Sequence, residues 1–266
     1  MELSTIEVHD DGERGTIALN RPDKLNPLGT TTLLELVSAA RWFDERPEVK
    51  VVTVLGRGRA FSAGADLAAF TTGGGTGTGG ADGGRTTTRD AADAGRRMAE
   101  AIEAMQAVTV ARLHGHCVGG GLVLAAACDL RVAADDTMFS IPEVDLGIPL
   151  AWGGIPRLVR EIGPAPTKEL VMTCRPFSAE EAKAAGFLNR VVAAAELDAE
   201  VEDLVAGLER KSAFTLTATK RHTNAVTEAM VGTARAWNDA DSLVAALRDP
   251  ESRTLAAAYL DRVRRR

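Results

Sequence analysis

The chain has 266 residues, 45% of them hydrophobic and 26% charged, and its formal net charge is −6 at pH 7. This length suffices to bury a large core, either as one domain or as a domain with an appended unit. The acidic balance provides no broad basic field, which argues against non-specific nucleic-acid binding. No apolar stretch reaches membrane-spanning length without a charge or a glycine, and no signal-peptide pattern opens the chain, so we expect no membrane span and a cytoplasmic location.

Three cysteines, Cys117, Cys128 and Cys174, are odd in number and lack the spacing of metal ligands. We therefore expect buried free thiols, which suit a reducing compartment, and no metal site.

The first third of the chain predicts short strands and one helix. The runs STIEVHD and GTIALNRP are separated by Asp11-Gly12, a pair typical of a β-hairpin turn. From Thr30 the apolar spacing predicts an amphipathic helix that ends near Pro47.

Three further runs, beginning at Val49, Val108 and Asp129, have the apolar character of buried strands. Because helices alternate with strands, the strands should pair in parallel through crossover connections. The sequence thus predicts an α/β fold.

Eight glycines interleaved with threonines fill residues 71–84. The segment lacks the apolar residues needed to pack on a core, so we expect a mobile surface loop. A phosphate-binding loop is the alternative, but the Gly-Lys-Ser/Thr that would complete that motif is missing.

The last part of the chain is rich in helix signals. Ser178 and Glu181 occupy the positions of a capping box, Gly186 stops that helix, and the strand-like run LNRVV follows. Beyond Glu196, four alanine-rich helical patterns follow one another. We expect a core over residues 1–195 and a helical unit over 196–266 whose small apolar faces need a partner.

The triplet Gly119, Gly120 and Gly121 precedes the helix-forming run LVLAAAC, which exposes backbone amides at a helix start. A second such donor is predicted in AFSAGADLAAF, residues 60–70. Two amides that face one oxygen would form an oxyanion hole. The alternative is that tight packing alone requires glycine in each segment.

Glu143 stands in the apolar run MFSIPEVDLGIPLAWGG. Partial desolvation there would raise the pKa of its carboxyl toward that of a general base, although a glutamate at a strand end more often points to water. Asp145 would share the face of Glu143 if a strand continues through both. Trp152 either walls an apolar pocket or belongs to the core, and His116 is expected to be a packed, neutral side chain.

Three segments, taken together and in this order, strongly resemble the crotonase superfamily, the enoyl-CoA hydratase/isomerase family. They are AFSAGADL, GHCVGGGLVLAAACDLRVA and FSIPEVDLGIPLAWGGIPRLVREIG, and IALNRPDKLNPLG and FSAEEAKAAGFLNRVV resemble two further landmarks of that family. The resemblance implies a crotonase-like spiral of repeated ββα units and a C-terminal α-helical trimerisation region, in homotrimers or hexamers.

The resemblance also implies a substrate and a site. The substrate is an acyl-CoA thioester whose enolate is stabilised by two backbone amides, which by position are those of Ala65 and Gly120, and no cofactor is needed because coenzyme A is part of the substrate. Glu143 corresponds to a catalytic glutamate. The family's coenzyme A contacts fall, largely through backbone, at positions Lys24, Leu25, Ala63, Asp66 and Leu67.

The C-terminal run AAYLDRVRRR is similar to a segment that reaches the coenzyme A of a neighbouring subunit. It puts forward Tyr259 and Arg262 as partners of adenine and phosphate. A basic helix end in solvent, favoured by the helix dipole, explains the same residues equally well.

The chain departs from the family at one informative position. Typical hydratases of the family carry a second catalytic glutamate two residues after the glycine triplet, where this chain has Val123. Hydration usually divides proton transfers between two carboxylates, and a positioned proton transfer contributes about a hundred- to ten-thousand-fold to the rate. Double-bond isomerisation can use one carboxylate, so the sequence favours an enoyl-CoA isomerase that works through Glu143.

Other functions stay open at this point. A hydratase of fatty-acid degradation could position its water with Glu143 and either Asp145 or His116. A non-catalytic acyl-CoA-binding protein would keep the oxyanion hole without the chemistry, and a thioester hydrolase is a fourth, less favoured reading.

Overall fold

The computed structural model describes residues 3–66, 88–236 and 238–264. The predicted glycine-rich loop over residues 71–84 lies outside the described residues. No described helix is long and apolar enough to cross a membrane.

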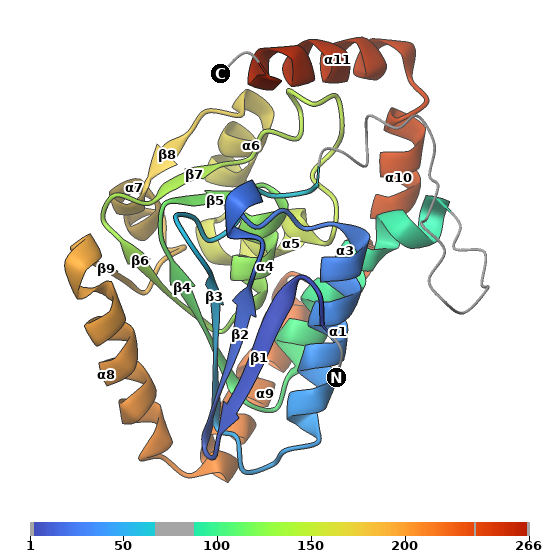
Figure 1. Ribbon diagram of the computed structural model, residues 1–266. Coiled ribbons are helices and arrows are strands. Elements are labelled where there is room, and N and C mark those ends of the chain that lie inside the picture. Colours follow the sequence, from blue (N-terminus) through green and yellow to red (C-terminus); the bar gives the residue numbers. More distant parts are fainter. Residues whose placement is uncertain (1–2, 67–87, 237, 265–266) are drawn as a thin grey trace.

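A six-stranded sheet forms the centre of the molecule, in the order β1-β2-β3-β4-β6-β9 (Figure 1). Only β1 and β2 are antiparallel, and every other neighbouring pair in this sheet is parallel. The strands span Ile6–Asp11, Arg14–Leu19, Val51–Gly56, Val108–Leu113, Leu130–Ala134 and Arg190–Val192. The predicted parallel α/β arrangement is therefore confirmed.

A second, three-stranded sheet has the order β5-β7-β8, with strands His116–Val118, Met138–Ser140 and Phe177–Ser178. In sequence, β4 and β5 form one pair and β6 and β7 form the next, and each pair gives one strand to each sheet. The chain thus winds through stacked turns of two strands and a helix. Glu143 and the glycine triplet both lie directly after strands of the small sheet.

Helices cover both faces of the large sheet. The helices α1, α3 and α4 supply most helical residues of the main hydrophobic core, and α8 packs on the other face, where Val51, Val110 and Val132 meet Leu197 and Val201. These helices span Thr30–Asp44, Thr88–Ala104, Gly120–Ala127 and Leu197–Glu209. The division of the chain at residue 196 stays a prediction, but the first helix after it is packed on the sheet.

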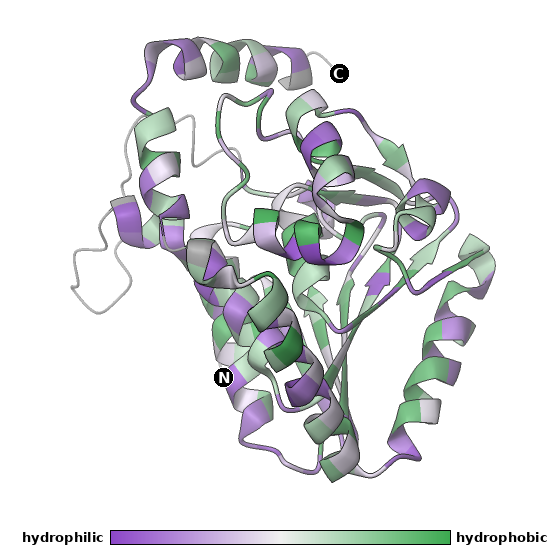
Figure 2. Ribbon diagram, turned by 180° about the vertical axis from the view of Figure 1, so that it is seen from behind, coloured by the Kyte–Doolittle hydropathy of each residue, from purple (hydrophilic) through white to green (hydrophobic). Residues whose placement is uncertain are grey.

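The remaining helices lie beside the small sheet, at the lower end of the large sheet and next to α3, and the C-terminal helix lies across the top of the view (Figure 1). They are α5 (Gly154–Ile162), α6 (Pro164–Thr173), α7 (Ala179–Ala184), α9 (Ala213–Met230), α10 (Asp239–Ala246) and α11 (Pro250–Arg264), with short 3₁₀ turns at Pro22–Lys24, Ala194–Glu196 and Thr233–Ala236. Figure 2 shows hydrophilic and hydrophobic residues alternating around α11, as expected of a helix at the surface.

Local signals in the sequence account for several element ends. The hydroxyl of Ser178 accepts a hydrogen bond from the amide of Glu181 at 3.2 Å, and Gly186 has φ +98° after α7, as the capping pattern predicts. The Glu181 carboxylate contacts Arg175 instead of closing the box. The hairpin turn is Gly12-Glu13, one residue later than expected, since Asp11 pairs with Arg14.

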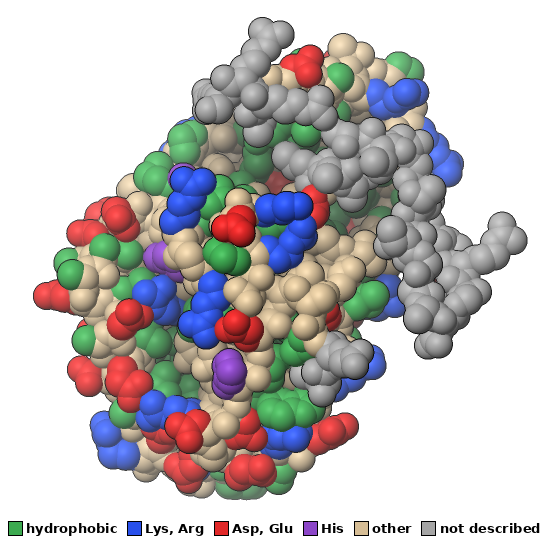
Figure 3. Space-filling view, viewed as in Figure 1, with side chains coloured by type: hydrophobic (Ala, Val, Ile, Leu, Met, Phe, Trp, Pro, Cys, Tyr) green, Lys and Arg blue, Asp and Glu red, His purple; other side chains and the backbone are tan. Residues whose placement is uncertain are grey.

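Basic and acidic side chains are intermixed over the face shown in Figure 3. No large patch of one sign covers the described part of this face.

Candidate active site

The glycine triplet connects β5 to α4, and each of its glycines faces a different side chain. A methyl group on Gly119, Gly120 or Gly121 would come within 3.0 Å of Glu143, Trp152 or Ser62, respectively. Gly119 also has φ +49°, a conformation that disfavours any other residue. Tight packing therefore requires all three glycines, and this packing brings a carboxylate and an indole beside the start of α4.

The helix start supplies the first backbone donor. The amide of Gly119 is used in a 2.9 Å hydrogen bond to the carbonyl of Ser140, which joins the ends of β5 and β7. Gly120 is the first residue of α4, so its amide has no acceptor within the helix. No hydrogen bond from this amide is found among the described residues.

The segment 62–66 supplies the second donor. The carbonyl of Gly64 accepts a hydrogen bond from the amide of Leu28 at 2.8 Å, and the amide of Asp66 donates one to the carbonyl of Leu28 at 3.2 Å. Because these groups alternate along an extended chain, the N–H of Ala65 points to the opposite side. That is the side of β5, to which Ser62 is hydrogen-bonded.

The two donors lie on neighbouring segments. A Cβ placed on Gly64 would be 3.6 Å from the amide nitrogen of Gly120. The amide of Ala65, like that of Gly120, makes no hydrogen bond within the described residues. Two unpaired amides on adjacent segments are what an oxyanion hole requires.

A buried asparagine, which the sequence analysis did not single out, holds this arrangement. The amide group of Asn26 donates to the carbonyls of Arg57 and Ala60, both at 2.9 Å, and its backbone carbonyl accepts from the hydroxyl of Ser62 at 2.8 Å. The Ser62 hydroxyl in turn accepts from the amide of Gly64 at 3.1 Å. Asn26 has φ 53°, which asparagine tolerates, and this preference was the available signal in LNPLG.

Glu143 lies in the turn after β7, and its side chain points inward. The residue is 9% exposed, and its Oε2 atom has no hydrogen-bond partner among the described residues. Burial raises the pKa of the Glu143 carboxyl to about 7, in the direction expected from its apolar surroundings. A carboxyl of this kind can both accept and return a proton near neutral pH.

Asp145 does not share the face of Glu143, because a turn and not a strand connects them. The amide of Ile148 donates to the carbonyl of Glu143 at 3.0 Å, which closes the turn. Asp145 is exposed, and its carboxylate lies 3.2 Å from the guanidinium of Arg262. The strand that would have placed both acids on one face does not continue past Ser140, so only Glu143 points inward here.

Val123 occupies α4 one turn below the glycines and is fully buried. A methyl group on Gly154 would come within 3.0 Å of its Cγ2 atom, so the valine packs against the start of α5. This position offers no proton donor or acceptor to the site. His116 is exposed on β5, which corrects the expectation of a packed histidine.

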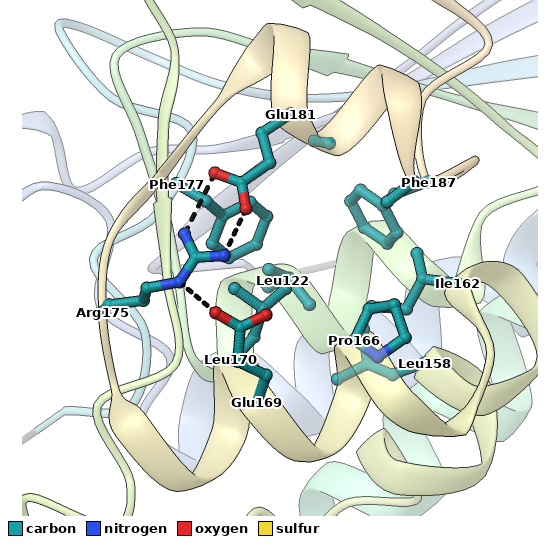
Figure 4. A pocket seen from close by; sticks show the side chains of 12 residues that line it. Leu122, Leu158, Ile162, Pro166, Glu169, Leu170, Arg175, Phe177, Glu181 and Phe187 are labelled. Carbon is teal, nitrogen blue, oxygen red and sulfur yellow. Dashed lines mark hydrogen bonds and ion pairs between the residues drawn. The ribbon is translucent and has the colours of Figure 1, made fainter.

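A small cavity lies away from these residues, between α5, α6 and α7 (Figure 4). Arg175 at its mouth donates to Glu169 and Glu181. The volume of this cavity is about 30 Å³, which is enough to hold water. Within residues 3–66, 88–236 and 238–264, no group of three His, Cys, Asp or Glu side chains could hold a metal ion.

The sequence model of enoyl-CoA hydratase/isomerase matches residues 14–264. The chain belongs to the enoyl-CoA hydratase/isomerase family. It is 34% identical over 82% of its length to the peroxisomal Delta(3,5)-Delta(2,4)-dienoyl-CoA isomerase of Arabidopsis thaliana, covering 80% of that protein. It is 35% identical over 80% of its length to a probable enoyl-CoA hydratase of Mycobacterium bovis, covering 78% of it.

Solved structures of enoyl-CoA hydratase/isomerase proteins share the fold. The crystal structure of an enoyl-CoA hydratase from Mycobacterium avium subsp. paratuberculosis K-10 superposes with a TM-score of 0.85 at 25% identity, covering 97% of this chain and 99% of that one. The crotonase-like α/β fold expected from the resemblance is confirmed, and the chain is an enzyme of this family. The trimerisation role of the C-terminal helices stays a prediction.

The positions that the family resemblance assigns to coenzyme A lie on two adjoining segments. The amide of Ala63, within the segment 62–66 that carries Ala65, donates to the carbonyl of Leu25 at 2.8 Å. Lys24 is exposed, and the Asp66 carboxylate lies 3.0 Å from the guanidinium of Arg21. Leu67 lies outside the described residues.

The C-terminal helix of this enoyl-CoA hydratase/isomerase chain lies against its own Glu143 turn. A methyl group on Gly147 would come within 3.0 Å of the backbone of Ser252 in α11, and Arg262 pairs with Asp145. Burial raises the pKa of the Tyr259 hydroxyl, and the guanidinium of Arg262 lies 5.2 Å from its ring centre. These two residues therefore stand near the candidate active site of the same chain.

Proposed function

We propose that this enzyme isomerises the double bond of an enoyl-CoA thioester with Glu143 as its single acid/base. The observation that carries the proposal is the pairing of one buried, uncompensated carboxyl beside Gly119 with an apolar Val123 at the other catalytic position. The relative of Arabidopsis thaliana with 34% identity is named an isomerase, which is in keeping with it.

In the proposed reaction a 3-enoyl thioester binds with its carbonyl oxygen at the amides of Ala65 and Gly120. The Glu143 carboxylate takes a proton from the α carbon, and the electron pair moves onto the thioester oxygen as a dienolate. Each amide donor is worth about 3 to 4 kcal/mol when it binds such a developing charge. The protonated Glu143 then returns the proton to the γ carbon, which yields the conjugated 2-enoyl thioester, and no further cofactor takes part.

The experiment that tests this proposal measures two substrates. A 3-enoyl-CoA and a 2-enoyl-CoA are each incubated with the enzyme, and the absorbance of the conjugated thioester is followed. We expect it to appear from the 3-enoyl substrate and to persist with the 2-enoyl substrate. Glu143→Gln should abolish turnover, whereas Glu48→Gln, at an exposed glutamate, should leave it intact.

Hydration of a 2-enoyl-CoA is the second candidate, favoured by the relative from Mycobacterium bovis, which is named a probable hydratase. Loss of the conjugated absorbance in the assay would support it and contradict the isomerase proposal. Binding of a CoA ester without turnover of either substrate would instead favour a non-catalytic binding protein.

A further inference from the structure

Trp152 occupies a slot between two helices, directly beside a proposed oxyanion donor. Its indole faces Gly95 of α3 on one side and Gly120 of α4 on the other, and a methyl group on either glycine would come within 3.0 Å of the ring. The two glycines make room for the indole. The slot would stand open to the start of α4 without it.

The backbone that carries this indole has an unusual conformation. Trp152 has φ 62° and Gly153 has φ 68°, so two successive residues are left-handed. A bulky residue in this region is strained and persists only where its surroundings enforce the conformation. Strain of this kind is concentrated at functional sites, where neighbouring side chains hold the strained residue in place.

Two charged side chains hold it. The guanidinium of Arg157, 1% exposed, donates to the carbonyl of Gly153 at 3.2 Å and approaches that of Trp152 at 3.5 Å. The carboxylate of Asp239, at the start of α10, accepts from the amide of Gly153 at 2.8 Å. Arg157 is itself paired with Glu103 of α3. Charged side chains therefore hold both the amide and the carbonyl of Gly153.

The position of the indole relative to the chemistry follows from the triplet. Gly119 faces the Glu143 carboxylate and Gly120, the next residue, faces Trp152. A thioester held at the Gly120 amide, with its α carbon within reach of Glu143, therefore lies beside the indole.

We propose that Trp152 closes the acyl compartment and makes the enzyme selective for short-chain enoyl-CoA thioesters. Trp152 is then a specificity-determining residue, and Asp239 is a positioning residue that acts through it. This inference rests on the proposed function, since it needs turnover of a CoA thioester at the same site.

The test is a chain-length profile of kcat/KM for straight-chain 3-enoyl-CoA substrates from butenoyl to dodecenoyl. We expect the unaltered enzyme to lose at least about tenfold in kcat/KM between hexenoyl and decenoyl, since one methylene that a pocket cannot accept is worth at least that much. Trp152→Ala, which opens the slot, should reduce this loss to less than about threefold. Trp42→Ala, which removes a half-buried indole on α1, should keep the original profile.

Asp239 gives a second measurement should Trp152→Ala fail to fold. Asp239→Ala removes the acceptor of the Gly153 amide and should flatten the profile by raising the kcat/KM of long substrates. Asp239→Asn keeps an acceptor oxygen and should restore the selectivity. A merely structural role of Asp239 would lower activity equally on every chain length.

Equal kcat/KM of the unaltered enzyme on butenoyl and dodecenoyl substrates would overturn the inference, as would an unchanged profile in Trp152→Ala. Failure of the proposed function has a different outcome, because it appears as no isomerisation at any chain length or as full activity in Glu143→Gln. The two failures are therefore distinguishable.

Discussion

Glu143 is the residue on which the proposed chemistry depends most. Its carboxyl is buried without a charged partner or a hydrogen bond to Oε2 among the described residues, so burial alone shifts its pKa upward. Val123, which is buried in α4, adds no charge that would shift it back.

Isomerisation should depend on pH through Glu143. The base must start as a carboxylate, and burial raises the pKa of this group to about 7. We expect kcat/KM to be low near pH 5, to rise through pH 7 and to level off near pH 8. A profile that is already flat at pH 5 would contradict the assignment of the base.

The same shift predicts a stability effect of Glu143→Gln. Below about pH 4.5 the Glu143 carboxyl is protonated in both the folded and the unfolded protein. Between pH 4.5 and pH 7 this carboxyl ionises in the unfolded chain but stays neutral in the folded one. The free energy of unfolding therefore falls as the pH rises through this range. Each unit of pKa shift corresponds to about 1.4 kcal/mol. The unfolding free energy of Glu143→Gln, compared with that of the unaltered protein, should therefore increase by about 3 kcal/mol between pH 4 and pH 8. Urea unfolding at both pH values measures this gain, with Glu48→Gln as the unaffected control.

Val123→Glu tests the missing acid. If the second carboxylate limits hydration, this variant should gain hydratase activity on a 2-enoyl-CoA by about a hundredfold or more. The valine is fully buried, so a cost in stability is expected as well. Val123→Gln, which has the same shape without the acid, is the matched control and should gain nothing.

At the scale of elements, the site depends on extended segments that other segments hold in place. The residues 62–66 lie between Leu28 and β5 and have hydrogen bonds to both. Asn26 links them to the chain that precedes them, through Arg57 and Ala60. The direction of the Ala65 amide is therefore a property of three segments together.

Asn26→Ala should disturb this arrangement. The change leaves the carbonyls of Arg57 and Ala60 without their donor in a buried place, and unsatisfied groups of this kind cost about 1 to 3 kcal/mol each. We expect a loss of about 2 to 4 kcal/mol in unfolding free energy and a fall in kcat larger than the change in KM. An unchanged kcat in the folded variant would show that Ala65 is positioned by other contacts.

Local signals predicted many elements, because they act within a few residues. The hydroxyl of Ser178 caps the start of α7, and Gly186 ends the turn after this helix because glycine readily adopts a positive φ. The direction of the Asp145 side chain was not predictable in this way, because it depends on whether a strand or a turn follows Pro142. His116 was expected to be packed, yet it lies at the exposed end of a short strand.

At the scale of the whole molecule, long-range contacts assemble the site from distant parts of the chain. The glycines of the triplet are evident in the sequence, but the side chains that face them come from residues 62, 143 and 152. No periodicity relates these positions, so the sequence suggested both an oxyanion hole and tight packing without joining them. The structure joins them, because the packing at Gly119 places Glu143 beside the proposed donor.

A buried ion pair attaches α9 to the large sheet. The ammonium of Lys220 lies 2.7 Å from the carboxylate of Asp129, before β6, and donates to the carbonyl of Ala107, before β4, at 2.9 Å. Lys220→Met should lower the unfolding free energy by about 2 kcal/mol, since the half-buried Asp129 carboxylate loses its cationic partner and keeps only the hydrogen bonds from Thr109. Arg262→Ala, which breaks an exposed pair, should cost less than about 1 kcal/mol in the same urea titration.

The three neighbouring glycines after β5 allow the parts of the site to be disturbed one at a time. A single methyl group introduced at residue 119 would press on the acid, at residue 120 on the indole, and at residue 121 on the serine that braces the opposite segment. Alanine substitutions at successive positions would thus bear first on the proposed base, then on the proposed specificity-determining residue and then on the supporting segment, within a stretch shorter than one helical turn.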